Sequence, residues 1–349
     1  TRCAPQWTSG HTGPQAFDVD NESGHAAEVN LVDTSGAVVA EIETIGPATT
    51  AAMTASLGPG GYSFRCRLSG RPTLTSAPVQ VSGPATEPVP AAVVPVTIAE
   101  LTGPNRAYQA WAADHLITLK AQVAKVGTDL QSGATGAART DWLAAQMTWE
   151  EVGASYDSFG DLGQAVDGLP DGLQGGVNDP DFTGLHRLEY GLWHDQPPAE
   201  LRPVVGGLET GVSAVQNQLS SDDLAGDPAN LPVRAHEILE DALRDHLSGI
   251  DDQGGGAAYP ETYADLQVTR TVLGYLAPLI QTRAPGLMPT AEKQMDALQA
   301  DLLATRTGAE WQPPASTPLA QRQQVDAAMG ALLETLAAVP NLLEVPPAP

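Results

Sequence analysis

Residues 179–193 read Asp-Pro-Asp-Phe-Thr-Gly-Leu-His-Arg-Leu-Glu-Tyr-Gly-Leu-Trp, a turn-forming segment that opens directly into a predicted helix. His186 and Glu189 are three residues apart, so a helix places them on one face. A neutral imidazole beside a carboxylate can bind a metal ion or exchange a proton, and Leu188 and Leu192 predict a buried setting. His-x-x-Glu is common in ordinary helices, so the motif needs support from its surroundings.

That support comes from the whole run between Asp179 and Trp193. It resembles the signature of the imelysin-like family, in particular its EfeO-type extracytoplasmic components of bacterial iron-uptake systems: D-P-x-F-T-G-[FL]-H-R-L-E, ending in a large apolar residue. Every position of the pattern is met. The resemblance implies an all-helical metal-binding domain preceded by a small β domain.

Composition limits the class of protein. The chain has 349 residues, which favours two domains over one. It carries 17 Lys plus Arg against 42 Asp plus Glu, a formal net charge of -25, so nucleic acid and anionic membranes are poor partners and cations are good ones. No apolar run approaches the roughly 20 residues that span a bilayer, which predicts a soluble chain. A leader could have been removed before Thr1 or lie outside this sequence, so its absence is no evidence for the cytoplasm.

Two cysteines, Cys3 and Cys66, lie far apart within the N-terminal region. They lack the Cys-x-x-Cys spacing of redox and metal motifs, which leaves a buried free pair or a disulfide. The disulfide is the favoured interpretation, and it predicts an oxidising compartment.

The region up to residue 83 is predicted to be a small all-β sandwich. Residues 27–32, 37–42 and 61–68 alternate polar and apolar side chains, and turn-forming clusters at 33–36 and 57–61 separate them. Cys3-Ala-Pro and the run Leu57-Gly-Pro-Gly-Gly-Tyr62 resemble the cupredoxin-like domain of EfeO-type proteins.

Metal binding in this β domain has limited support in the sequence. No His or Met follows Cys66 there, so a type 1 copper centre is not expected. Glu28, Glu41 and Glu43 could form a weaker oxygen site, and charged residues on a solvated sheet face are the alternative interpretation.

Residues 84–104 are rich in proline, which predicts an extended linker and a domain boundary. From residue 105 to 349 apolar residues recur at intervals of three and four, as in amphipathic helices. Such helices are expected near 105–130, 137–159, 200–219, 230–248, 262–282, 288–305 and 318–339, with loops at 160–184, 249–260 and 306–317. The number of helices fits the pair of four-helix bundles that the resemblance implies.

The resemblance also implies acidic partners for His186 and Glu189 from other helices. The matching positions are Glu150, Asp167 and Glu240, whereas a further acidic position of the family is Gly153 in this chain. An Asp before a Gly is also typical of a turn, and Glu240 also fits a solvated helical face. We interpret His115, His194, His236 and His246 as structural residues.

One imidazole with several carboxylates forms a hard, oxygen-dominated site that suits iron, as Fe2+ or Fe3+, with Cu2+ or Zn2+ as alternative ions. The resemblance then implies a periplasmic or cell-surface iron-binding protein, exported and open to lipid anchoring outside this sequence, that delivers iron to a membrane permease beside a haem peroxidase partner. A metallopeptidase is the rival function, although His-Glu-x-x-His is absent. Binding of an anionic polysaccharide is a third alternative, which would need a bridging cation.

Overall fold

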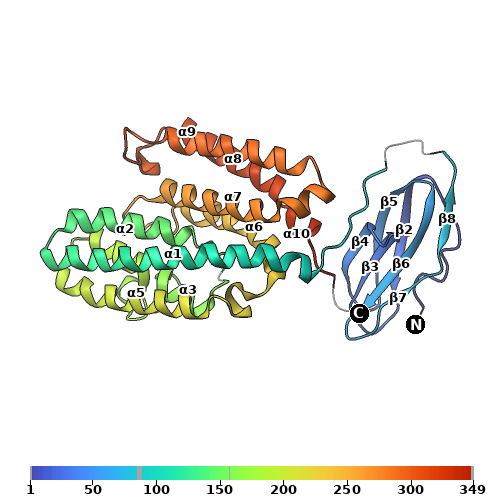
Figure 1. Ribbon diagram of the computed structural model, residues 1–349, viewed down its shortest axis with the longest axis horizontal. Coiled ribbons are helices and arrows are strands. Elements are labelled where there is room, and N and C mark those ends of the chain that lie inside the picture. The colour runs from blue at the N-terminus through green and yellow to red at the C-terminus, as the bar shows by residue number, and fades with distance from the viewer. Residues whose placement is uncertain (1, 85–88, 157, 347–349) are drawn as a thin grey trace. The chain divides into compact units, whose positions relative to one another are not determined.

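The computed structural model describes residues 2–84, 89–156 and 158–346, so residues 85–88 of the predicted linker, residue 157 of the predicted 137–159 helix, and residues 1 and 347–349 lie outside the described residues. The chain divides into a strand-built unit, Thr1–Val96 with Val345–Pro349, and a helical unit, Thr97–Glu344 (Figure 1). The predicted order of a β region followed by an all-helical region is confirmed.

The β unit consists of two sheets that enclose an apolar core. Their strands are β1 (Gly10–His11), β2 (Gly13–Asn21), β3 (Ala27–Asp33), β4 (Val38–Ile45), β5 (Thr49–Leu57), β6 (Gly60–Leu68), β7 (Leu74–Thr75) and β8 (Val79–Ser82). One sheet has the order β1-β8-β6-β3-β4 with β7 on β6, and β2 pairs with β5 in the other. Leu31, Leu57 and Phe64 are buried between them.

Three predicted strands and the predicted disulfide of this unit are present. Strands β3, β4 and β6 cover the three alternating segments, and Asp33 closes the β3–β4 hairpin by accepting backbone N–H groups from Ser35 and Ala37. Cys3 and Cys66 are joined in a disulfide. The bridge ties the N-terminal segment to β6 in the centre of the larger sheet.

The helical unit contains two groups of packed helices. The first comprises α1 (Ile98–Ser132), α2 (Thr135–Glu150), α3 (Gly160–Asp167), α4 (Gly184–Trp193) and α5 (Pro198–Gln218). The second comprises α6 (Leu231–Asp241), α7 (Ala258–Arg283), α8 (Leu287–Ala304) and α9 (Leu319–Leu336), and α10 (Ala338–Leu342) packs against α6. Both groups contribute to one unit because α1 and α2 also pack against α7 (Figure 1).

Short turns complete this unit. They are the 3-10 turns η1 (Gly176–Asn178), η3 (Pro228–Asn230) and η5 (Pro314–Ser316), and the π-helical turns η2 (Asp222–Gly226) and η4 (Ala242–His246). The turn η4 continues α6 directly, so the predicted 230–248 helix is in fact an α-helix with a wide last turn. Wide turns of this kind are frequent at functional sites.

Several boundaries differ from the sequence-based expectation. The predicted 137–159 helix is α2, which ends at Glu150. The helix α1 begins at Ile98, inside the predicted 84–104 linker, because Thr97 and Glu100 form a capping box that starts the helix before Pro104. The predicted 160–184 loop contains α3, a short helix in which Val166 is buried. Among the described residues, no helix is long and apolar enough to cross a membrane.

Candidate metal centre

The short helix α4 brings His186 into the interior of the helical unit. Gly184 starts this helix with φ +86°, and a Cβ atom there would lie 2.4 Å from the carbonyl oxygen of Val166. Only glycine allows this close approach. The Gly of the Phe-Thr-Gly-Leu-His run therefore places the last residue of α3, Asp167, beside the first turn of α4.

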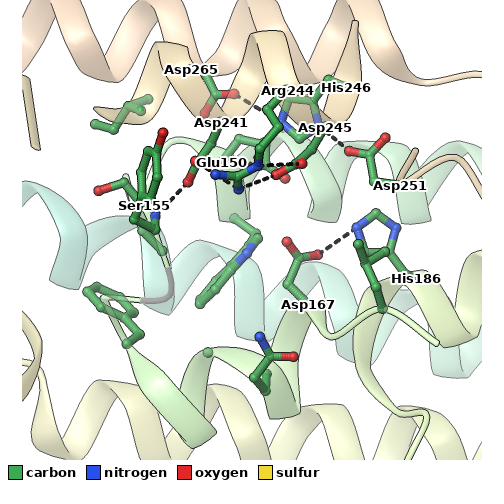
Figure 2. Close-up of a pocket in the computed structure, with 18 of the residues that line it drawn as sticks. Glu150, Ser155, Asp167, His186, Asp241, Arg244, Asp245, His246, Asp251 and Asp265 are labelled. Carbon is green, nitrogen blue, oxygen red and sulfur yellow. Dashed lines mark hydrogen bonds and ion pairs between the residues drawn. The ribbon is translucent and has the colours of Figure 1, made fainter. Parts of the chain in front are cut away.

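The pair predicted from His-x-x-Glu is formed and deeply buried. His186 is 2% exposed and Glu189 is 1% exposed. Nδ1 of His186 lies 3.0 Å from Oε2 of Glu189, and Nε2 lies 3.4 Å from Oδ1 of Asp167. The imidazole is therefore held at one nitrogen and directs the other toward a second carboxylate (Figure 2).

Glu150, at the end of α2, is connected to Asp167 through hydrogen bonds from the side-chain amide of Gln146. Nε2 of Gln146 donates to Oε1 of Glu150 at 2.7 Å and to Oδ1 of Asp167 at 3.0 Å. Gln146 is fully buried, so its amide fixes two carboxylates from different helices. The structure thus brings together four of the predicted ligands, namely His186, Glu189, Glu150 and Asp167.

A second buried imidazole, His246, lies against the same acidic group, and sequence analysis interpreted it as structural. It ends the turn η4, where Nε2 lies 3.0 Å from Oδ2 of Asp265 and 3.8 Å from Oε2 of Glu150. Nδ1 is hydrogen bonded to Asp251 and lies 3.6 Å from Oε2 of Glu261. The structural interpretation of His246 is therefore too narrow, because the imidazole contacts four buried carboxylates.

The buried group contains six carboxylates around two imidazoles. Each of these side chains is either buried or lines the pocket next to it: Glu150, Asp167, Glu189, Asp251, Glu261, Asp265, His186 and His246. Even with both imidazoles protonated, ionised carboxylates would leave the group with a net negative charge. A bound cation would offset that charge, because buried charges require partners.

The pKa values of these groups are shifted. Burial, followed by repulsion from Asp167 and Asp265, raises the pKa of Glu150 well above its usual range. Burial raises the pKa of Asp265 to about 6, although its hydrogen bond with His246 acts in the opposite direction. Protons therefore compensate part of the negative charge, as expected where carboxylates gather without a cation.

The pKa values of the two imidazoles are raised, although burial alone would lower them. Burial alone would lower the pKa of His186, but Asp167 and Glu189 raise it well above the usual value. Burial would likewise lower the pKa of His246, and Asp251 and Asp265 raise it well above the usual value. Both rings are therefore surrounded by an environment that stabilises positive charge.

A pocket of about 380 Å³ opens beside this group (Figure 2). Its wall includes Glu150, Asp167, His186, His246, Asp251 and Asp265. At the other end it is lined by Tyr156, which is exposed, and by Arg244, whose guanidinium pairs with Asp241 at 2.9 Å and with Asp245 at 2.7 Å. An ion can therefore reach the imidazoles from a surface that carries both acidic and basic groups.

Glu240 is the predicted ligand that the structure does not bring to the group. It is absent from the residues that line the pocket, and its Oε2 lies 3.4 Å from Nδ1 of His236. The neighbouring Asp241 lines the pocket instead. One residue turns a helix by about 100°, so Glu240 and Asp241 lie on different faces of α6.

Gly153, which matches a further acidic position of the family, has a structural reason to be glycine here. Its φ is +75°, and a Cβ atom would lie 3.0 Å from Val268 and 3.2 Å from Ile238. A side chain at this position would strain the backbone and would require these neighbouring side chains to shift by a few tenths of an ångström.

The weaker site predicted in the β unit is partly assembled. Nδ2 of Asn30 donates to Glu28 at 2.9 Å and to Glu41 at 3.2 Å, which joins these two side chains. Arg67 lies 2.6 Å from the same oxygen of Glu28 and balances its charge, whereas Glu43 is exposed. A metal at Glu28, Glu41 and Glu43 stays a prediction.

Four residues of the buried group were missed by sequence reasoning: His246, Asp251, Glu261 and Asp265. Glu261 and Asp265 are four apart on α7, so the helix places two carboxylates on one buried face. Asp251 lies beyond the Ser-Gly at 248–249 and returns to His246 through the loop before α7. The spacing of Glu261 and Asp265 was the available signal, since ionisable residues are rare in an otherwise buried helical stripe.

The chain has recognisable relatives. Residues 105–253 match the imelysin family model. Proteins described as iron uptake system component EfeO, from Escherichia coli O157:H7, Escherichia coli K12 and Shigella flexneri, are 25% identical over 342 residues, which cover 98% of this chain and 89% of the relatives. The helical unit therefore includes a segment that matches the imelysin family model, in a chain that is similar along almost its whole length to the iron uptake component EfeO.

Proposed function

We propose that this protein binds iron in the pocket of its helical unit, with Nε2 of His186 and the carboxylates of Asp167 and Glu150 as ligands. The observation that carries the proposal is the buried group of six carboxylates and two imidazoles next to an accessible pocket. Among the described residues, Oδ1 of Asp251 has no hydrogen-bond partner although it is buried. Such an atom is costly unless something binds it.

The donor set supports iron over the structural zinc sites of proteins. The proposed ligand atoms are carboxylate oxygens and one imidazole nitrogen, and both cysteines are used in the disulfide. Oxygen-rich sets favour hard ions such as Fe3+, while imidazole also suits Fe2+, Cu2+ and Zn2+. Iron is the proposed cargo, with Cu2+ and Zn2+ as its competitors.

We propose that the protein works outside the cytoplasm and passes iron to a membrane permease, together with a haem peroxidase. The description of its relatives as iron uptake components supports the transport role. The disulfide between Cys3 and Cys66 supports an oxidising compartment.

The test measures metal content and proteolysis in the same preparations. The wild-type chain and the His186→Ala variant are incubated with Fe2+ under nitrogen and with Fe3+ citrate, desalted and analysed for metal. We expect bound iron in the wild type and a large loss in the variant. His194→Gln is the matched control, because this histidine on the same helical segment stacks on Tyr190 outside the pocket.

The rival function is metal-dependent hydrolysis. The same preparations are therefore loaded with Zn2+ and incubated with unfolded casein. Retention of zinc in preference to iron, with cleavage that disappears in His186→Ala, would reject iron transport in favour of a metallopeptidase.

A further inference from the structure

The two buried imidazoles have similar contacts with carboxylates. In each, Nδ1 is hydrogen bonded to one carboxylate, Glu189 for His186 and Asp251 for His246, and Nε2 points toward at least one other. Nδ1 of His246 also lies 3.6 Å from Glu261. Metal-binding histidines usually have this arrangement, because a carboxylate at one nitrogen orients the ring and leaves the other nitrogen for the ion. His246 therefore has the geometry of a ligand that the proposed iron site does not use.

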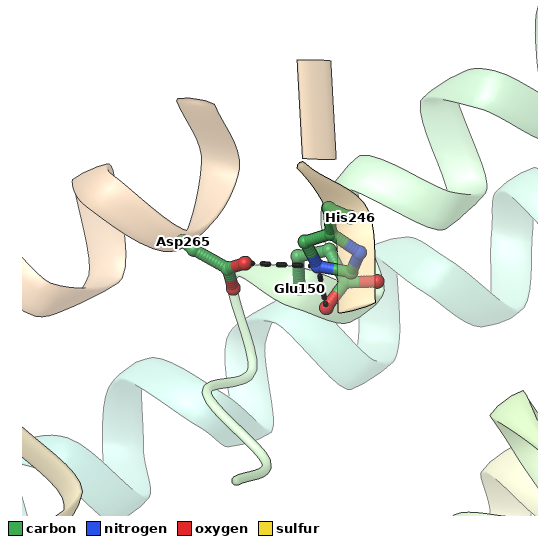
Figure 3. A group of neighbouring side chains, drawn as sticks. All are labelled: Glu150, His246 and Asp265. Carbon is green, nitrogen blue, oxygen red and sulfur yellow. Dashed lines mark ion pairs between the residues drawn. The ribbon is translucent and has the colours of Figure 1, made fainter. Parts of the chain in front are cut away.

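Three potential ligand atoms converge at His246 (Figure 3). They come from His246, Glu150 and Asp265, which are all buried, and they lie within 4.8 Å of one another. Each comes from a different element, namely η4, α2 and α7. One imidazole and two carboxylates held by separate elements can enclose an ion without a change of backbone.

From this geometry we infer a second cation position in the pocket, bound by Nε2 of His246 and by Glu150 and Asp265. Glu150 would serve both positions. Its Oε1 is held beside Asp167 by Gln146, and its Oε2 faces His246. The helical unit then binds two ions that share a bridging carboxylate, an arrangement that helical bundles can support.

The unpartnered oxygen of Asp251, which also supports the proposed iron site, is consistent with a further ligand in the pocket. Asp251 is 3% exposed, lines the pocket, and uses one oxygen for His246, while its other oxygen has no hydrogen-bond partner among the described residues. A self-contained ion-pair cluster would satisfy this atom. Asp251 contacts Nδ1 of His246 rather than Nε2, so its free oxygen supports a ligand in the pocket without itself being a ligand of the second cation.

This inference rests on the proposed function and adds the number of ions. It is tested by titrating Fe2+ alone, under nitrogen, into the full chain by calorimetry and by measuring iron after desalting. We expect two ions per chain in the wild type and one in His246→Gln. Asp265→Asn removes the other ligand by a near-isosteric change, and it should also reduce the count to one.

The controls separate this inference from its premise. Each variant is compared with the wild type by circular dichroism and thermal unfolding, and Asp265→Asn decides the result if His246→Gln does not fold. Glu41→Gln tests whether a second ion lies in the β unit.

One ion in the wild type that persists in both pocket variants would overturn the second position and leave the proposed iron function intact. Two ions in both variants would also overturn it, because the second ion would then lie elsewhere. No ion in the wild type would reject the proposed function itself.

Discussion

Glu189 contacts the imidazole nitrogen of His186 that does not face Asp167. Its Oε2 lies 3.0 Å from Nδ1 of His186, and its Oε1 accepts backbone N–H groups from Gln253 at 3.1 Å and Gly255 at 2.8 Å. Both oxygens are therefore occupied within the protein, and Glu189 is not among the residues that line the pocket. In the His-x-x-Glu motif of this chain, the histidine faces the pocket and the glutamate orients the histidine.

Glu189→Gln should therefore weaken iron binding without abolishing it. A glutamine that keeps its oxygen toward the backbone N–H groups presents its NH2 group to Nδ1 of His186. The ring must then carry its proton on Nε2, the nitrogen needed for the ion. Loss of such an orienting partner typically costs about 10- to 100-fold in metal affinity, measurable by competition with a chelator.

Two further variants complete this comparison. His186→Ala should remove binding at this position, and Glu240→Gln should leave affinity unchanged because Glu240 pairs with His236 outside the pocket. If Glu189→Gln lost iron as completely as His186→Ala while remaining folded, Glu189 would have to be a direct ligand.

Gly184→Ala should damage both stability and iron binding. The residue has φ +86°, and the new Cβ would lie 2.4 Å from the carbonyl oxygen of Val166. Left-handed backbone costs a non-glycine residue about 1–3 kcal/mol, and relief of the contact would move the end of α3, including Asp167, away from His186. Thermal unfolding and iron titration of the same variant measure the two effects.

Gly207→Ala is the matched control for this substitution. Gly207 lies within α5, and among the described residues no heavy atom outside its own helix backbone and chain neighbours lies within 4 Å of the place that the alanine methyl group would take. Alanine should stabilise this helix by up to about 1 kcal/mol and leave iron affinity unchanged. Equal effects of the two substitutions would remove the special role assigned to Gly184.

Reduction of the Cys3–Cys66 disulfide should destabilise the β unit selectively. The two residues are 63 apart in sequence, and the chain-entropy model gives a loop of that size about 4 kcal/mol. Cys66→Ser should therefore lower the unfolding temperature of the β unit in calorimetry. The iron content of the helical unit should not change, and a parallel loss of iron would contradict this independence.

The sequence predicted those parts of the site that are encoded locally. The spacing of His186 and Glu189 places them together once a helix forms, and the run around Gly184 specifies where that helix begins. The alternating strands and the amphipathic helices were predicted in the same way, from periods of two and 3.6 residues. These features require only neighbouring residues.

The second half of the site depends on contacts between distant segments. His246 reaches Glu150 only because η4 widens the end of α6, and Asp251 reaches His246 only because the following loop turns back before α7. Glu240 was predicted from motif matching, which cannot establish which face of the helix turns toward the pocket. Packing between the two helical groups decides which acidic residues meet.

Without iron, the folded protein should be more stable in mild acid than at neutral pH. Burial raises the pKa of Asp265 to about 6 from a usual value of 3.8, so its ionisation destabilises the folded state increasingly as pH rises from about 4 to 6. The pKa of His186 is raised well above 6.5 because Asp167 and Glu189 outweigh burial. Its stabilising contribution is present below 6.5 and is lost as pH rises through the folded-state pKa.

Asp251 acts in the opposite direction but at a different pH. Burial would raise its pKa, and His246 lowers it below 3.8, so its contribution is lost only in stronger acid. The unfolding temperature of the helical unit without iron should therefore fall between pH 5 and pH 8.

Iron should reverse this trend, because the ion replaces the protons that the raised pKa values retain in the pocket. Iron affinity should increase with pH over the same range, so the difference in unfolding temperature between iron-bound and iron-free protein should widen from pH 5 to pH 8. Differential scanning fluorimetry with Fe2+ under nitrogen measures both curves, with His194→Gln as the control for an exposed histidine. A stabilisation by iron that is equal at pH 5 and pH 8 would mean that binding releases no protons, which contradicts an ion held by Glu150, Asp265 and the two imidazoles.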